Sequence, residues 1–228
     1  MNIVKRVIRR GRRELKKAAR LRKLRELDLI YVHPNFVYHR DLEIGGVAID
    51  AGCSYEADFS QYMIKEHQLR AYGVDPTKKH QPALEQLEER YGDRFKHLPL
   101  AISAESGTLT FHESAENESG SLLNDHVNVQ QDQITSYEVE SVTLRVLSER
   151  VGADQIEILK LDLEGAEYAL LEGVEAEDLT PFKQVFIEFH HHAIPEYTVA
   201  DTARLVKRLE SFGYKSYSLD DHNYIFFR

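Results

Sequence analysis

The sequence is poor in cysteine: a single one, Cys53, occurs among 228 residues. One thiol excludes an internal disulfide and a zinc site made of several cysteines. It also favours a reducing compartment, so we expect a cytoplasmic protein. Long apolar runs are lacking as well, and we therefore expect no membrane-spanning segment. The first residues, MNIVKRVIRRG, are basic without an apolar core, so we expect no secretory signal.

Acidic and basic residues are unevenly distributed along the chain, whose formal net charge is −9. Residues 1–25 contain twelve Lys or Arg and one acid, a net charge of +11, which leaves the other 203 residues at −20. Apolar residues recur at helical spacing across residues 2–28. The pattern predicts a basic amphipathic helix over residues 1–28, followed by one domain over residues 29–228.

A basic amphipathic helix is typical of proteins that lie on anionic membrane surfaces. The apolar face of this one is poor, because it holds Gly11 and the small Ala18 and Ala19, so we expect mainly electrostatic, salt-sensitive contact. The alternative is packing on its own acidic domain, or on that of a neighbouring protomer in a homo-oligomer. Nucleic-acid binding ranks lowest, because no aromatic residues are interleaved with the basic ones.

Strand-like and helix-like patterns alternate from Gly46 onward. Short apolar runs such as GVAID, QIEILKLD and KQVFIEFH are typical of buried strands, and helical patterns lie between them. This alternation predicts a parallel sheet with crossover helices. Residues 113–136 are polar and aperiodic, which predicts a long loop, and such loops are often functional.

Charged residues stand where the predicted strands end. Lys160, Asp162 and Glu164 alternate with leucines, so they point to the same face. The other strands end in the same way, at Asp50, Asp75, Glu188 and His190. Ligands of open α/β sheets bind at the carboxyl ends of the parallel strands. We therefore predict a binding site at this edge of the sheet.

The loop after the first predicted strand, DAGCSYEADFS, is built to hold a polar ligand. Gly52 permits a tight turn, and backbone N–H groups at the start of the next helix can donate to the ligand. The loop lacks the G-x-G-x-x-G pattern and Asp50 precedes its glycine, so a dinucleotide and a nicotinamide oxidoreductase are disfavoured. A ligand with a cationic group fits better, and Asp75, 25 residues later, can accept ribose hydroxyls.

Six stretches together resemble one known family, the FkbM-type S-adenosylmethionine-dependent methyltransferases. In chain order they are VAIDAGCSYEADFS, AYGVDP, LPLAISAESGTLTFH, SVTLRVL, ILKLDLEGAEYALLEGV and VFIEFH. The most specific part, KLDLEGAE, is similar to the family's Lys-x-Asp-x-Glu-Gly-x-Glu. The resemblance covers roughly residues 44–228. It implies a class I methyltransferase fold, an α/β Rossmann-like sheet of strand order 3-2-1-4-5-7-6 with strand seven antiparallel.

The resemblance also implies S-adenosylmethionine as the cofactor. The residues implied at the cofactor are Asp50, Gly52, Ser54, Asp75, Ile102, Ser103 and Asp162. The first three are expected at its methionine end, Asp75 at the ribose, and residues 101–103 along the adenine. Glu56-Ala57 stands where many relatives carry a second glycine in the first loop, which leaves open a binding module without turnover.

The activity implied by the resemblance is O-methylation of a sugar, a glycan or another hydroxylated small molecule. The sulfonium methyl is already activated, so the protein has to align the acceptor oxygen and remove its proton. The candidate catalytic residues are His190, Glu164 and Asp162, with His190 or Glu164 as the base. A purely structural His190 and methylation of an amine stay open. We expect no metal, because consecutive histidines on a strand face opposite ways.

Overall fold

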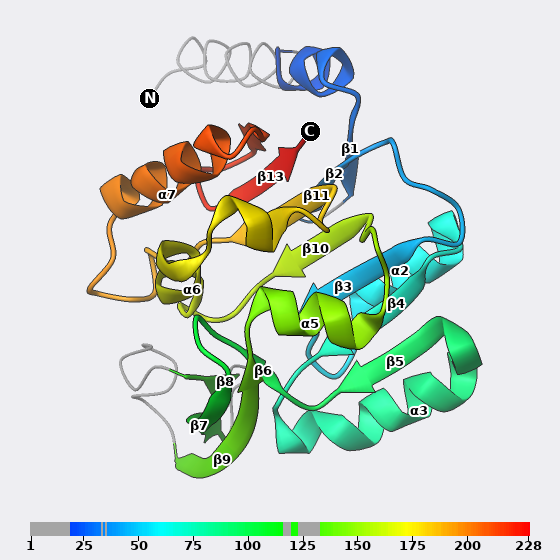
Figure 1. The fold of residues 1–228 in the computed structure, drawn as a ribbon, viewed down its shortest axis with the longest axis vertical. Coiled ribbons are helices and arrows are strands. Elements are labelled where there is room, and N and C mark those ends of the chain that lie inside the picture. Colours follow the sequence, from blue (N-terminus) through cyan, green and yellow to red (C-terminus); the bar gives the residue numbers. More distant parts are fainter. Residues whose placement is uncertain (1–18, 33, 35, 116–119, 123–132) are drawn as a thin grey trace, which may run out of the picture. The chain divides into compact units, whose positions relative to one another are not determined.

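The computed structural model describes residues 19–228, apart from residues 33, 35, 116–119 and 123–132 (Figure 1). The chain divides into two compact units, residues 1–41 and 42–228. In the first unit, residues 19–26 are helical, and two strands pair antiparallel, Leu29–Val32 (β1) and Phe36–His39 (β2). Residues 1–18 of the predicted basic helix lie outside the described residues, and the domain boundary after residue 28 stays a prediction.

A seven-stranded sheet forms the centre of the second unit. Its strands are Val47–Ala51 (β3), Arg70–Val74 (β4), Phe95–Leu98 (β5), Ile158–Leu161 (β10), Gln184–Glu188 (β11), Lys215–Ser218 (β12) and Asn223–Phe227 (β13). The order across the sheet is β12-β13-β11-β10-β3-β4-β5. Five strands pair in parallel, and β13 runs antiparallel to both β11 and β12. Counted along the chain this is the predicted order 3-2-1-4-5-7-6, so the class I methyltransferase fold is confirmed.

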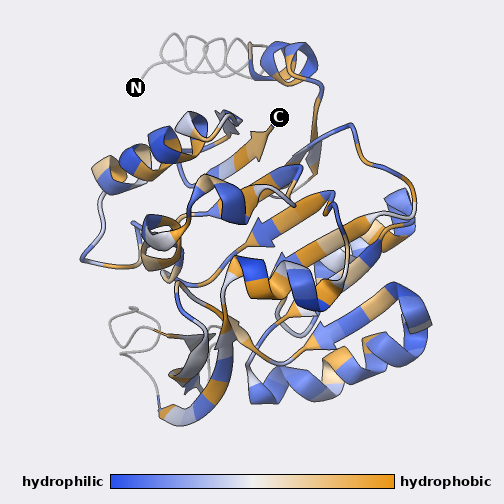
Figure 2. Ribbon diagram, in the orientation of Figure 1, coloured by the Kyte–Doolittle hydropathy of each residue, from blue (hydrophilic) through white to orange (hydrophobic). Residues whose placement is uncertain are grey.

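Helices cover both faces of this sheet. They are Asp58–His67 (α2), Gln81–Tyr91 (α3), Leu144–Val151 (α5), Glu167–Gly173 (α6) and Val199–Ser211 (α7). One apolar cluster joins α5, α6 and α7 to β3, β10 and β11, and another joins α2 and α3 to β4 and β5. Because parallel strands are covered on both faces, their residues are mostly apolar, as Figure 2 shows for the central strands.

Local sequence explains where several helices begin and end. Thr198 caps α7: its hydroxyl accepts from the Asp201 backbone, and the Asp201 carboxylate accepts from the Thr198 backbone. Gly152 ends α5 in the left-handed conformation, with φ of 68°. None of the helices in the described part of the chain is long and apolar enough to cross a membrane.

A second sheet lies at one end of the unit. Its strands are Ala101–Ile102 (β6), Gly107–Ser114 (β7), Gly120–Ser121 (β8) and Ile134–Val142 (β9), in the order β6-β9-β7-β8. The prediction of a loop over residues 113–136 is therefore wrong at both ends of this range. There Glu113 pairs with Thr135, and Ser114 pairs with Ile134. The side chains of β9 are mostly exposed, and an antiparallel strand with a solvated face needs few apolar residues.

Candidate functional site

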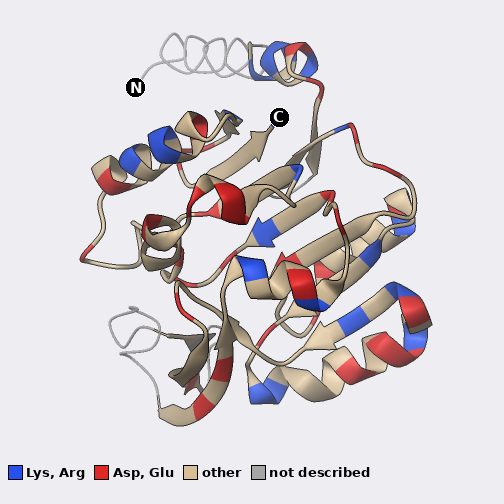
Figure 3. Ribbon diagram, viewed as in Figure 1, with Lys and Arg blue, Asp and Glu red and all other residues tan. Residues whose placement is uncertain are grey.

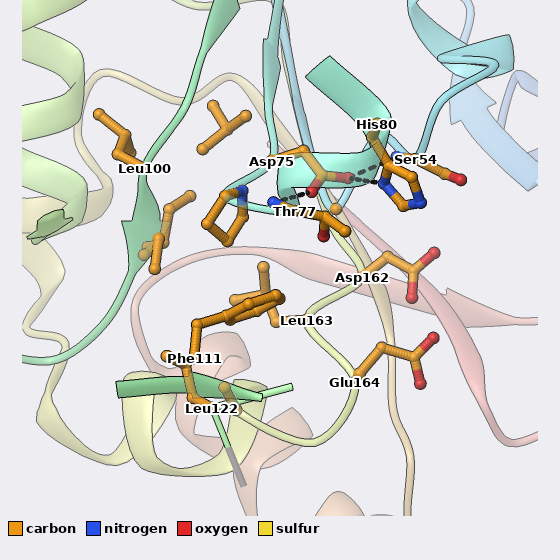
Figure 4. Close-up of a pocket in the computed structure, with 16 residues that line it drawn as sticks. Ser54, Asp75, Thr77, His80, Leu100, Phe111, Leu122, Asp162, Leu163 and Glu164 are labelled. Atoms are coloured by element: carbon orange, nitrogen blue, oxygen red, sulfur yellow. Dashed lines mark hydrogen bonds and ion pairs between the residues drawn. The ribbon is translucent and has the colours of Figure 1, made fainter. Parts of the chain in front are cut away.

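A cavity of about 230 Å³ lies at the carboxyl ends of β3, β4 and β10 (Figure 4). The predicted residues in its wall are Gly52, Ser54, Asp75, Ile102, Asp162 and Glu164. The second sheet contributes Phe111, and Leu122 directly follows β8. Three predicted residues, Asp50, Ser103 and His190, are outside this wall. The structure thus brings most of the predicted site together, while the roles of these residues stay predictions.

Gly52 allows the loop after β3 to pass directly against the loop after β10. Its φ is +76°, and a Cβ atom at this position would lie 1.8 Å from the carbonyl oxygen of Asp162. Any side chain would therefore force the two loops apart. Further along the first loop, Ala57 is buried and itself adopts the left-handed conformation, with φ of 46°. Ala57 thus follows a backbone path that glycine adopts more readily.

The Asp75 carboxylate, at the end of β4, is buried and held by three groups. Oδ1 accepts from the Thr77 backbone at 2.8 Å, and Oδ2 accepts from the Ser54 backbone at 2.9 Å. Nδ1 of His80 lies 3.1 Å from Oδ2. Burial alone would raise the pKa of Asp75, but the hydrogen bonds from His80 and Thr77 outweigh burial and hold this pKa below its ordinary value. Asp75 is therefore a fixed, ionised acceptor.

Two buried polar atoms beside Asp75 have no hydrogen-bond partner within the described part of the chain. They are Oγ of Ser54 and Nε2 of His80, and both residues line the cavity. Since buried polar groups are nearly always paired, these atoms fit a polar ligand held next to Asp75. We did not predict His80 from the sequence; its one signal is a histidine five residues after the acid that ends a strand.

The buried Asp50 of β3 and the partly buried Lys160 of β10 form an ion pair. Figure 3 shows how few charged residues the central strands contain. Oδ2 of Asp50 accepts from the Ser60 hydroxyl at 2.9 Å, and Oδ1 lies 3.3 Å from the Lys160 ammonium. Lys160 also lies 3.1 Å from Asp162 and donates to the Gly52 carbonyl. Burial alone would lower the pKa of Lys160, but Asp162 and Asp50 raise it well above its ordinary value. The charged lysine thus ties the ends of β3 and β10 together.

Ser103 is also outside the cavity wall, although Ile102 before it lies within. Its hydroxyl donates to the carbonyl oxygen of Glu105 at 2.6 Å. In this arrangement Ser103 holds the turn between β6 and β7.

His190 is buried just after β11, among three carboxylates. Its Nδ1 lies 3.1 Å from Glu167, and its Nε2 lies 3.6 Å from Asp162 and 3.7 Å from Glu164. Burial alone would lower the pKa of His190, but Glu167, Asp162 and Glu164 raise it to about 10. His190 is therefore an imidazolium at neutral pH. In this arrangement it cannot take a proton from an acceptor, which favours Glu164 over His190 as the base.

The KLDLEGAE motif forms a turn around the fully buried Glu167. The Glu167 carboxylate accepts from the backbone N–H groups of Leu163 and Gly165. Glu164 and Gly165 both have positive φ, 50° and 102°. The turn places the carboxylates of Asp162 and Glu164 at the cavity, where Figure 4 shows them next to each other.

Asp162, Glu164 and His190 each present one atom that could bind a metal ion, and these atoms lie within 4.8 Å of one another. Of the other consecutive histidines, His192 stacks on His190, with ring centroids 5.8 Å apart. The rings of His191 and His192 also pack on His222, with centroid distances of 4.6 and 4.7 Å. His190, His191 and His192 follow β11 and lie outside the strand, so the strand alternation from which we expected no metal does not apply to them.

The chain was compared with known proteins. A family model described as "Methyltransferase FkbM domain" matches residues 45–216. No curated protein matches. Among solved structures, Aeropyrum pernix fibrillarin with natively bound S-adenosyl-L-methionine is 10% identical, with a TM-score of 0.43, and the alignment covers 82% of this chain and 68% of that one.

Two further structures are similarly distant. The N-terminal domain of human METTL16 in complex with SAH is 9% identical, with a TM-score of 0.45 and coverage of 83% of this chain and 62% of that one. A methyltransferase from Pyrococcus furiosus is 14% identical, with a TM-score of 0.41 and coverage of 96% and 98%.

Proposed function

This chain belongs to the FkbM methyltransferase domain family, and from this premise we propose that it transfers a methyl group from S-adenosylmethionine to a hydroxyl of a sugar, a glycan or another small hydroxylated acceptor. The observation that carries the proposal is the cavity at the ends of β3, β4 and β10. Its wall combines a fixed carboxylate, Asp75, with the buried unpaired atoms of Ser54 and His80.

The residues of the wall fit the parts of this cofactor. Asp75 would hold the ribose, because its Oδ1 accepts one protein hydrogen bond and keeps a lone pair for a hydroxyl. Leu100, Ile102 and Phe111 supply an apolar surface for the adenine. Gly52 and Ser54 would lie along the methionine end, where Asp162 attracts the amine.

The cofactor supplies, when bound, a methyl group already activated by the sulfonium. What remains for the protein is to hold the acceptor oxygen in line, exclude water and accept the hydroxyl proton. We assign the role of proton acceptor to Glu164, because its carboxylate faces the cavity whereas His190 is positively charged. His190 acts as a positioning residue that holds the two carboxylates.

An amine acceptor is the second candidate, because Asp162 and Glu164 give the cavity an acidic wall that attracts cations. A module that binds the cofactor without turnover is less well supported, since Ala57 adopts the left-handed conformation that a glycine would take.

Calorimetry with S-adenosylhomocysteine tests the cofactor assignment. Asp75→Asn should weaken binding roughly ten- to a hundredfold, since a charged hydrogen-bond acceptor is worth ~1.5–3 kcal/mol. The exposed Asp93→Asn is the matched control and should bind like the wild type. Failure of the wild type to bind, or equal affinity of Asp75→Asn, would refute the assignment. A mass gain of one methyl group on an acceptor from a panel of glycans, hydroxylated metabolites and amines then decides the nucleophile.

A further inference from the structure

Three side chains of types that bind metals converge where the ends of β10 and β11 meet. Asp162 and Glu164 follow β10, and His190 follows β11, its parallel neighbour in the sheet. We propose that these three residues bind one divalent metal ion at the rim of the cavity. The ion's binding follows from these residues alone, whereas its role in the reaction rests on the proposed function.

The distances suit a single ion. Nε2 of His190 lies 3.6 Å from Oδ1 of Asp162 and 3.7 Å from Oε2 of Glu164, and all three ligand atoms lie within 4.8 Å of one another. Two ligands that each lie about 2.1 Å from an ion are separated by roughly 3–4 Å. Small side-chain adjustments therefore suffice to close the three atoms around an ion.

The histidine is oriented as metal-bound histidines usually are. A ring nitrogen that does not bind the ion commonly donates to a carboxylate, which fixes the ring. Nδ1 of His190 lies 3.1 Å from Oε1 of Glu167, and Glu167 is itself held by the backbone of Leu163 and Gly165. This contact directs the other nitrogen, Nε2, toward Asp162 and Glu164. The ion would displace the Nε2 proton of the imidazolium to solvent and replace its positive charge next to the two carboxylates.

The charge balance of the cluster also favours a cation. Four carboxylates gather around two basic groups: the acids are Asp50, Asp162, Glu164 and Glu167, and the bases are Lys160 and His190. Glu188 adds only part of a charge, because burial and Asp162 raise its pKa to about 7. Lys160 is paired with Asp50 and Asp162. Negative charge is therefore in excess next to the cavity, and a divalent ion would offset most of it.

The mixed ligand set points to a first-row ion such as Zn²⁺ or Mn²⁺. Imidazole suits Zn²⁺ and carboxylates suit Mn²⁺, whereas Ca²⁺ and Mg²⁺ prefer ligand sets made of oxygen alone. Asp162 and Glu164 also line the cavity, so the ion would lie where an acceptor can reach it. There it would bind the acceptor oxygen and lower its pKa. Glu164 keeps a second carboxylate oxygen that can accept the proton. The proposal revises our expectation of a metal-free site, which considered only the consecutive histidines.

Titration of the full chain with Mn²⁺, after chelator treatment and dialysis, tests the site. Mn²⁺ is used in place of Zn²⁺ because it binds less readily to the neighbouring histidines His191, His192 and His222. The concentration of free Mn²⁺ is measured by electron paramagnetic resonance. We expect one Mn²⁺ per chain. Glu164→Gln and His190→Gln should each weaken binding by at least ~10-fold. The exposed Glu196→Gln is the control and should match the wild type.

Absence of stoichiometric Mn²⁺ binding to the wild type, or wild-type affinity in both ligand variants, would overturn the proposal. Circular dichroism and thermal melting without metal show whether each variant is folded. Glu164 is partly exposed and its replacement by Gln is nearly isosteric, so Glu164→Gln tests the site even if His190→Gln is unstable. S-adenosylhomocysteine calorimetry in the presence of EDTA separates this proposal from the proposed function. Cofactor binding without Mn²⁺ binding refutes the metal site alone, and the reverse result refutes the cofactor assignment alone.

Discussion

At the scale of single residues, Gly52 imposes the tightest steric requirement of the candidate site. Gly52→Ala would place a Cβ 1.8 Å from the Asp162 carbonyl oxygen, in addition to the cost of positive φ. We expect a loss of about 2–4 kcal/mol in the free energy of unfolding, measured by urea denaturation.

Gly152→Ala is the matched control, because Gly152 has a similar φ of +68° but no atom within 4 Å of the added Cβ. It should cost only about 1 kcal/mol. Equal losses in the two variants would show that the contact between the loops adds nothing to the conformational cost.

Asp75 should make stability depend on pH. Its pKa in the folded state lies below the ordinary value of 3.8, so its stabilising contribution is complete above that value and is lost as pH falls through the lower, folded-state pKa. Asp75→Asn mimics the protonated form. The wild type should therefore exceed this variant in unfolding free energy by roughly 1–3 kcal/mol at about pH 6, and by less at about pH 3.

Urea denaturation at the two pH values measures this difference, with the exposed Asp93→Asn as the control. A constant difference between the wild type and Asp75→Asn would mean that the Asp75 carboxylate has the same proton affinity in the folded and unfolded states.

At the scale of elements, the second sheet is joined to the loop after β4 through Tyr137. The Tyr137 hydroxyl accepts from the Lys78 backbone at 2.9 Å, donates to the carboxylate of Glu113 on β7, and lies 3.3 Å from the carbonyl oxygen of Pro76. Tyr137→Phe keeps the ring and removes these bonds, each worth about 0.5–1.5 kcal/mol. We expect faster amide hydrogen exchange across residues 107–114, measured by mass spectrometry.

Tyr91→Phe is the control for this prediction. Its hydroxyl donates to Gln61 at 2.8 Å, away from the second sheet, so exchange across residues 107–114 should stay unchanged. Unaltered exchange in Tyr137→Phe would show that the sheet is held by other contacts. S-adenosylhomocysteine should also bind Tyr137→Phe more weakly, because Phe111 of this sheet lines the cavity.

The elements differ in how much of them the sequence predicted. The strands β3, β10 and β11 were predictable because apolar runs buried on both faces are distinctive, and the family resemblance supplied their order. The strand β9 was not, because its exposed polar side chains carry no apolar periodicity. In the site, charges at strand ends led us to expect Asp75 and Asp162 at one edge of the sheet, and both line the cavity there, while their roles stay predictions.

The side-chain contacts within and between the loops of the site could not be predicted from the sequence. His80 meets Asp75 because the loop after β4 turns back on itself, and Glu167 holds His190 because the segments after β10 and β11 fold against each other. Spacing along the chain does not encode these distances. Nor did the sequence predict that the Asp50 carboxylate contacts Ser60 and Lys160, and a role of Asp50 at the cofactor stays a prediction.

At the scale of the whole molecule, the charge difference between residues 1–25 and the rest of the chain leads to a binding prediction. The net charge of +11 in this segment should bring the protein to anionic liposomes at low salt, since each Lys or Arg near such a surface adds about 1 kcal/mol. A truncated protein that begins at Asp28 should stay unbound. Flotation measures both, and added salt should release the full-length protein.

Neutral liposomes are the control for the flotation. If the full-length and truncated proteins float alike at low salt, the basic segment does not contact membranes. The alternative, that this segment packs on an acidic domain, would then be favoured.

The contact between Gly52 and Asp162 makes the two halves of the site interdependent. Lys160 reinforces it by donating to Gly52 in one loop and to Asp162 in the other, so a shift of either loop would disturb its contacts with the other. Binding events on the two sides are then thermodynamically linked. If bound cofactor raises the affinity for the acceptor by some factor, bound acceptor must raise the affinity for the cofactor by the same factor. The dissociation constant of the cofactor should therefore change when the acceptor is bound, and that of the acceptor should change by the same factor when the cofactor is bound.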